Sequence, residues 1–149
     1  MIPRLVYAAA VPAVVIACSD SGPAVISLNQ LVGTWGMSRL VYIRVSDGAV
    51  SPDQLKLYGV HITISIDRSG TAVLTVDDGI TTPTRDSAQV STHGDTLVFQ
   101  ATSSLVAFKS TVRMSGSTMT WLAVDTSSFD VDGDGTDDIA RERDTWQRR

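Results

Sequence analysis

Residues 60–67, VHITISID, and residues 71–77, TAVLTVD, decide the fold. In the first segment apolar and polar side chains alternate at every step, with Val60, Ile62, Ile64 and Ile66 on one face. In the second, Ala72, Leu74 and Val76 share a face. A period of two is the mark of a half-buried β-strand, and the Arg-Ser-Gly between the segments is a tight turn. The two segments are therefore predicted to form an antiparallel hairpin.

The same pattern continues along the chain and predicts an all-β domain. Further strands are expected at residues 34–45, 85–92, 96–101, 106–114, 118–125 and 139–149, separated by Gly-containing turns. About eight strands with short connections predict an antiparallel up-and-down meander that closes into a barrel, with an interior that is either filled or holds one small ligand. The alternation slips near Arg39, which predicts a β-bulge. One short helix is expected within residues 51–59, with Ser51 as the cap and Pro52 in the first helical position.

Composition excludes some classes of partner. The chain has 149 residues, of which 43% are hydrophobic and 19% charged, and its net charge is −4. No basic stripe of the kind that binds nucleic acid is present in the sequence. A mildly acidic domain also gains no attraction from an anionic membrane surface.

The first 17 residues are predicted to be a signal peptide rather than part of the fold. Arg4 precedes an apolar run over residues 5–17, which is too short to span a bilayer, and Cys18 follows as the only cysteine. The segment VIAC resembles a bacterial lipobox, in which Cys18 would become the lipidated N-terminus and anchor the protein to the cell envelope. Ser19 in place of an aspartate indicates the outer membrane, facing the periplasm or the exterior. The alternative is a secreted protein cut near Ala17.

The mature chain is then predicted to hold a tether over residues 18–27 and a barrel domain over residues 28–149. The stretches LVGTWGMSRLVYI and DTWQRR, with Gly33 and Trp35 in the first, resemble small bacterial lipocalin-like lipoproteins. The resemblance implies a lipocalin-like barrel in which Trp35 plugs the closed end. It also implies a basic residue of the last strand, Arg148 or Arg143, packed over Trp35 by a cation–π contact.

An acidic loop near the end of the chain is the one candidate metal site. Its spacing fits the start of a calcium loop, with Asp130, Asp132, Asp134, Thr136 and Asp138 as possible ligands and Gly135 at the bend. The twelfth position is Arg141 instead of the bidentate glutamate, and strands rather than helices flank the loop, so any calcium affinity should be weak. The alternative is a polar turn between two strands, because Asp and Gly are common turn residues.

No other motif predicts chemistry. His61 and His93 are expected to face solvent, and the sequence contains no GxSxG motif, so we do not expect an enzyme or a cofactor beyond weakly bound calcium. The run RERDTWQRR is interpreted as a solvated strand face, or else a docking edge. Two functions stay open: a barrel that binds a small hydrophobic or amphipathic molecule, and a filled barrel that contacts another, unidentified, envelope component. An interior under about 300 Å³ would exclude the first.

Overall fold

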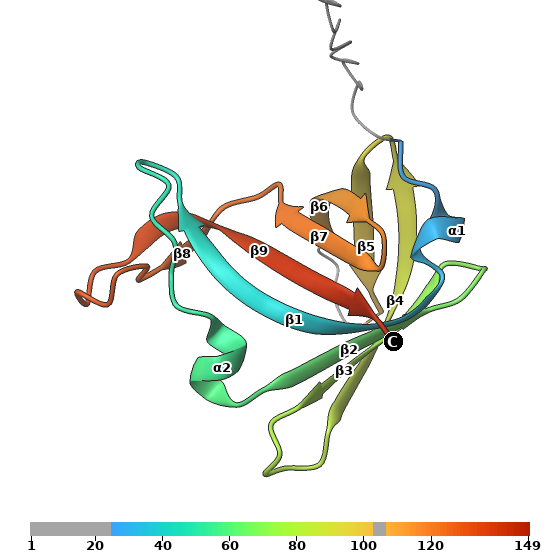
Figure 1. The fold of residues 1–149 in the computed structure, drawn as a ribbon, viewed down its shortest axis with the longest axis horizontal. Helices are drawn as coiled ribbons and strands as arrows, with labels where there is room; N and C mark the ends of the chain where they lie inside the picture. The colour runs from blue at the N-terminus through green and yellow to red at the C-terminus, as the bar shows by residue number, and fades with distance from the viewer. Residues whose placement is uncertain (1–24, 103–106) are drawn as a thin grey trace, which may run out of the picture.

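The computed structural model describes residues 25–102 and 107–149, which form a closed antiparallel barrel (Figure 1). Its elements, in chain order, are α1 (Leu28–Leu31), β1 (Gly33–Arg44), α2 (Gln54–Tyr58), β2 (His61–Ile66), β3 (Thr71–Asp77), β4 (Thr84–His93), β5 (Thr96–Ala101), β6 (Ala107–Ser115), β7 (Thr118–Ala123), β8 (Ser127–Phe129) and β9 (Asp138–Arg148). No helix among the described residues has the length and hydropathy of a membrane span.

The barrel closes because its first and last long strands pair with each other. β1 and β9 are antiparallel from Trp35 opposite Arg148 to Arg44 opposite Ala140, and they run side by side in Figure 1. Each of β1 to β6 pairs with the next strand, and β9 pairs with β7 and then, at its other end, with the short β8. β7 and β8 thus follow one another along the same edge of β9. Eight strand positions therefore complete the predicted up-and-down barrel.

The predicted bulge lies in β1, where the register against β9 shifts between Met37 and Arg39. Two consecutive residues, Ser38 and Arg39, are exposed there. The extra residue changes which positions face inward, so that Leu40 joins Met37 at the barrel interior although the two are three residues apart.

One end of the barrel is filled by side chains. Trp35, Ile64, Leu97, Met119 and Trp146 have almost no exposed surface and form one contiguous cluster with their neighbours. Dense packing of this kind leaves no room for a ligand at this end.

The N-terminal segment packs against the filled end. Ile26 lies within the segment predicted to be a tether, but it is buried, and its amide donates to the carbonyl of Gly94 at 2.8 Å. Leu31 of α1 is also fully buried. In α1 the Gln30 side chain accepts a hydrogen bond from the amide of Ser27 at 2.8 Å, which satisfies a donor at the start of the helix.

The second short helix is where it was predicted, but its cap differs. The expected cap, Ser51 followed by Pro52, is wrong: α2 begins at Gln54, and the side chain of Asp53 accepts from the amide of Leu55 at 3.3 Å. The hydroxyl of Ser51 instead accepts from the amide of Tyr42 in β1 at 2.9 Å. Ser51 therefore fixes the loop to the barrel wall.

Candidate functional site: the barrel interior

The closed end is organised around Trp35. Its indole is fully buried, and its Nε1 donates to the carbonyl of Leu31 at 2.8 Å. The guanidinium carbon of Arg148 lies 4.2 Å from the ring centroid, and the same group donates to the carbonyls of Gln30 and Val32, both at 2.8 Å. Of the two predicted partners of Trp35, Arg148 is the one that packs over the ring.

Gly33 permits this arrangement. Its backbone φ of +134° is one that residues other than glycine rarely adopt. A Cβ at this position would also lie only 2.9 Å from Nη1 of Arg148. Glycine is needed because the guanidinium crosses this backbone to reach the carbonyls and the ring. The predicted Gly33 and Trp35 motif thus has a physical role at the closed end.

Beyond this filled end the barrel holds a cavity of about 360 Å³. Its lining is mainly apolar and comes from most strands of the barrel: Met37, Leu40, Ile62, Ile64, Leu74, Phe99, Ala101, Phe108, Trp121 and Trp146. The volume exceeds the lower limit of about 300 Å³ for small-molecule sites.

Two carboxyl groups, Glu142 and Asp144, complete the lining from β9. Asp144 is only 3% exposed, and its Oδ1 has no hydrogen-bond partner in the protein. Burial, with the charge of Glu142 and a hydrogen bond to it, raises the pKa of Asp144 to about 8. Tyr42 donates from its hydroxyl to Oε2 of Glu142 at 3.1 Å, and burial beside Glu142 raises the pKa of the Tyr42 phenol.

Other polar atoms of the interior also lack partners. The Nε1 atoms of Trp121 and Trp146 and the hydroxyl of Ser110 are buried without a hydrogen bond to protein. The two indole rings contact each other, with centroids 4.8 Å apart. Such groups are costly when unpaired. Trp121 and Trp146 line the cavity, so a bound molecule with a hydrogen-bond acceptor would be stabilised beside them.

A second hollow of about 400 Å³ adjoins the cavity at the rim. Phe108 and Glu142 line both spaces, and Ala107, Ala123 and Asp125 belong to the outer one. Glu142 therefore lies at the entrance, and Asp144 lies two residues further inward along β9.

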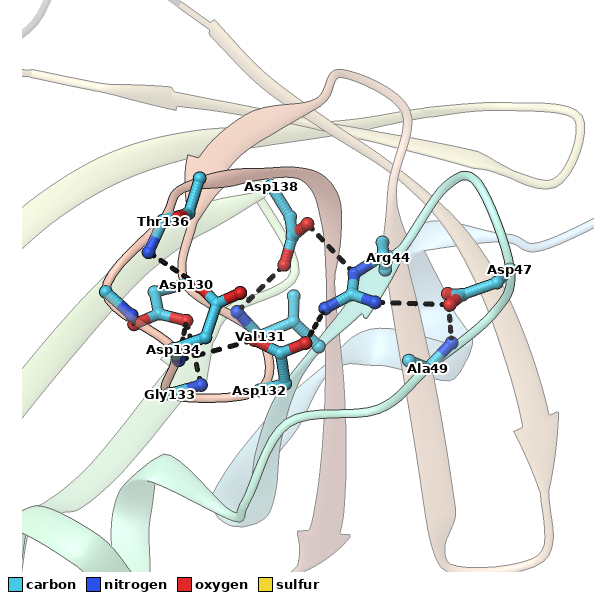
Figure 2. Close-up of polar contacts among 11 residues, drawn as sticks. Arg44, Asp47, Ala49, Asp130, Val131, Asp132, Gly133, Asp134, Thr136 and Asp138 are labelled. Carbon is cyan, nitrogen blue, oxygen red and sulfur yellow. Dashed lines mark hydrogen bonds and ion pairs between the residues drawn. The ribbon is translucent and has the colours of Figure 1, made fainter.

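The acidic loop lies at the far end of β1 and β9 from Trp35. Figure 2 shows the guanidinium of Arg44 between Asp47 on one side and Asp132 and Asp138 on the other. Arg44 Nε is 2.9 Å from Oδ1 of Asp138, and its Nη2 bonds to Asp132. The bond to Arg44 lowers the pKa of Asp132, and the bonds to the two aspartates raise the pKa of Arg44.

The predicted ligands only partly converge. Carboxylate oxygens of Asp130, Asp132 and Asp134 lie within 4.8 Å of one another. Asp138 is instead directed to Arg44 and to the amide of Val131, 3.2 Å away, while the Thr136 amide donates to Asp134 at 2.8 Å (Figure 2).

Asp130 itself accepts three backbone bonds, from the amides of Gly133, Asp134 and Gly135. These bonds and Arg44 give the loop its shape, and a calcium ion would compete with Arg44 for Asp132.

The remaining predicted sites are easily placed. His61 and His93 are both exposed, as expected. Cys18 and the predicted signal peptide, residues 1–17, lie outside the described residues.

The interpretation of RERDTWQRR, residues 141–149, as a solvated face is wrong for the positions that face inward. Asp144 and Trp146 are buried on the inner face of β9, as is Ala140 just before the run, whereas Arg141 and Gln147 are exposed on the outer face. The period-two alternation is visible in the sequence, because Ala140 and Trp146 lie on the same face of the strand as Glu142 and Asp144. The high charge of the segment concealed it.

The chain was compared with protein-family models, with curated proteins and with solved structures, and none of the three comparisons found a match. The class of protein is therefore defined by the fold alone: a closed antiparallel barrel with an internal cavity.

Proposed function

We propose that this protein is a lipocalin-like barrel that binds a small hydrophobic or amphipathic molecule and performs no catalysis. The observation that supports the proposal is the apolar cavity of about 360 Å³ at the unfilled end of the barrel. The alternative, a solid barrel that acts only through its surface, is disfavoured by the same cavity.

The cavity offers enough apolar contact for useful affinity. A ligand that buries roughly 200 Å² of apolar surface gains about 5 kcal/mol before the costs of association. Aromatic walls from Phe99, Phe108 and Trp121 provide rigid contact area at low entropic cost.

Binding is tested with N-phenyl-1-naphthylamine, an uncharged fluorescent probe at neutral pH, added to the full-length protein. We expect saturable probe fluorescence that 1-octanol displaces. Leu74→Trp, which places a larger side chain in the cavity, should weaken probe binding at least about tenfold.

Val73→Trp is the matched control, because Val73 precedes Leu74 on β3 and is 38% exposed on the outer face. Equal binding by both variants, with native far-ultraviolet circular dichroism, would place the probe outside the barrel. Absence of any displaceable binding to the wild type would reject the proposal.

We propose further that Cys18 carries lipid and holds the barrel at a bacterial envelope membrane. The motivation is the lipobox-like VIAC segment before the only cysteine. Mass spectrometry of protein isolated from its membrane should find an N-terminal Cys18 with added acyl mass, and Cys18→Ser should release the protein into the soluble fraction. An unmodified Cys18 in wild-type protein would contradict the anchor.

A further inference from the structure

The polar groups of the cavity lie on one wall. Glu142 and Asp144 come from β9, beside Trp121 of β7, whereas Ile62, Leu74 and the neighbouring strands present only apolar side chains. A molecule in the cavity therefore meets carboxyl groups along one edge and hydrocarbon along the others. Such a division fits an amphiphile with a single polar head.

No basic side chain of the described residues lines this wall. The arginines that flank the acids in β9, Arg141 and Arg143, have the opposite parity, and neither Glu142 nor Asp144 forms an ion pair in the described part of the chain. Asp144 is 3% exposed and its Oδ1 has no hydrogen-bond donor. An acceptor buried in this way is stabilised by a ligand that brings a donor, and more so by a cationic one.

The groups facing Asp144 limit the charge of that ligand. Its own strand presents Glu142, β1 presents Tyr42 bonded to Glu142, and β7 presents Trp121. All the titratable groups among these are acids, and the pKa of Asp144 is raised to about 8. Near neutral pH Asp144 is therefore largely protonated, and a cationic group beside it would favour its ionised form.

We propose that Glu142 and Asp144 bind the protonated amine of a small amphiphile whose hydrocarbon part lies against the apolar walls of the cavity. This inference rests on the proposed binding function and specifies the chemistry of the ligand. An ammonium group has three donors, so it is able to bond both carboxylates, whereas an alcohol has one donor and a carboxylate head would be repelled.

The experiment compares n-octylamine, 1-octanol and octanoate, which share a chain length and differ in head group, by calorimetry and tryptophan fluorescence on the full-length protein at pH 7. We expect octylamine to bind at least about tenfold more tightly than octanol, and octanoate to bind weakest. Asp144→Asn and Glu142→Gln should each reduce the difference between amine and alcohol. Asp95→Asn, which removes one carboxylate in the turn before β5, should leave it unchanged.

A second measurement needs no variant. Because the bound amine favours ionised Asp144, octylamine binding should release protons near pH 7, which is detected as a heat that depends on the ionisation enthalpy of the buffer. Octanol should release none.

The outcomes separate the two proposals. Equal affinities for amine and alcohol, or an unchanged preference in folded Asp144→Asn, would overturn the amine site while the binding function stands. Absence of binding by all three compounds would overturn both.

Discussion

Asp144 should make the barrel less stable as the pH rises through the neutral range. The pKa of this carboxyl is about 3.9 in an unfolded chain and is raised to about 8 in the barrel, mainly by burial. Between these values the folded state holds one proton more than the unfolded state, so the free energy of unfolding falls with increasing pH. The stabilising contribution is complete below about pH 4 and is lost as the pH approaches 8.

The size of the effect follows from linkage. One proton changes stability by somewhat over 1 kcal/mol per pH unit, hence by about 3 kcal/mol between pH 5 and pH 7. Urea denaturation at fixed pH values from 5 to 8 measures it. Asp144→Asn, which keeps the shape but does not titrate, should flatten the curve.

Other titrating groups are controlled in the same experiment. Four aspartates have pKa values that hydrogen bonds lower, at Asp132 mainly the bond to Arg44, and they are ionised in both states above pH 5: Asp47, Asp67, Asp78 and Asp132. The two histidines of the chain, His61 and His93, are replaced by Gln in a common background. Parallel curves for this background and its Asp144→Asn derivative would refute the reasoning.

Further substitutions test the closed end, the turns and the acidic loop by urea denaturation or thermal melting. Trp35→Ala should cost about 3–5 kcal/mol, as loss of a buried aromatic ring does, and a cost under 1 kcal/mol would contradict its place in the core. Arg148→Met should cost about 1–2 kcal/mol through the lost cation–π contact and hydrogen bonds, with Arg148→Lys recovering only part; no cost would show that the contacts are inconsequential. Gly70→Ala should destabilise clearly more than Gly116→Ala, because both have positive φ but only at Gly70 would a Cβ meet a backbone carbonyl, at 2.5 Å; equal costs would contradict this. If the acidic loop is the candidate calcium site and not a polar turn, 10 mM calcium should stabilise the wild type by about 1 kcal/mol and Asp132→Ala by none, and no shift in either would remove the site.

The strands of the barrel could be predicted because the alternation of apolar and polar residues within each strand can be recognised from the local sequence alone. The alternation in residues 60–67 and 71–77 indicates which face of each strand is buried, and the glycine turns indicate that neighbours in sequence pair. The bulge was also predicted, because the alternation of apolar and polar residues is interrupted near Arg39. Closure of β1 on β9 was predicted only from the strand count and from the lipocalin-like resemblance, because the pairing of distant segments is not encoded locally.

The candidate site was harder to predict because it depends on which charges are buried. In β9 the acids Glu142 and Asp144 alternate with Arg141 and Arg143. A segment with so many charges is expected from its composition to be solvated. Only the pairing of β9 with β1 and β7 places Asp144 opposite Leu40 and Trp121, away from water. The acidic loop shows the converse: its motif was obvious, but Arg44, 88 residues away from Asp132, could not be assigned to it from sequence.

The bulge in β1 connects these observations. Without the extra residue at Ser38, strict alternation from Trp35 and Met37 would direct Arg39 inward and Tyr42 outward. With it, Leu40 lines the cavity and Tyr42 reaches Glu142. The wall of the cavity therefore carries carboxyl groups without an arginine opposite them. One inserted residue thus keeps Arg39 away from the two carboxyl groups, which the proposed amine site requires.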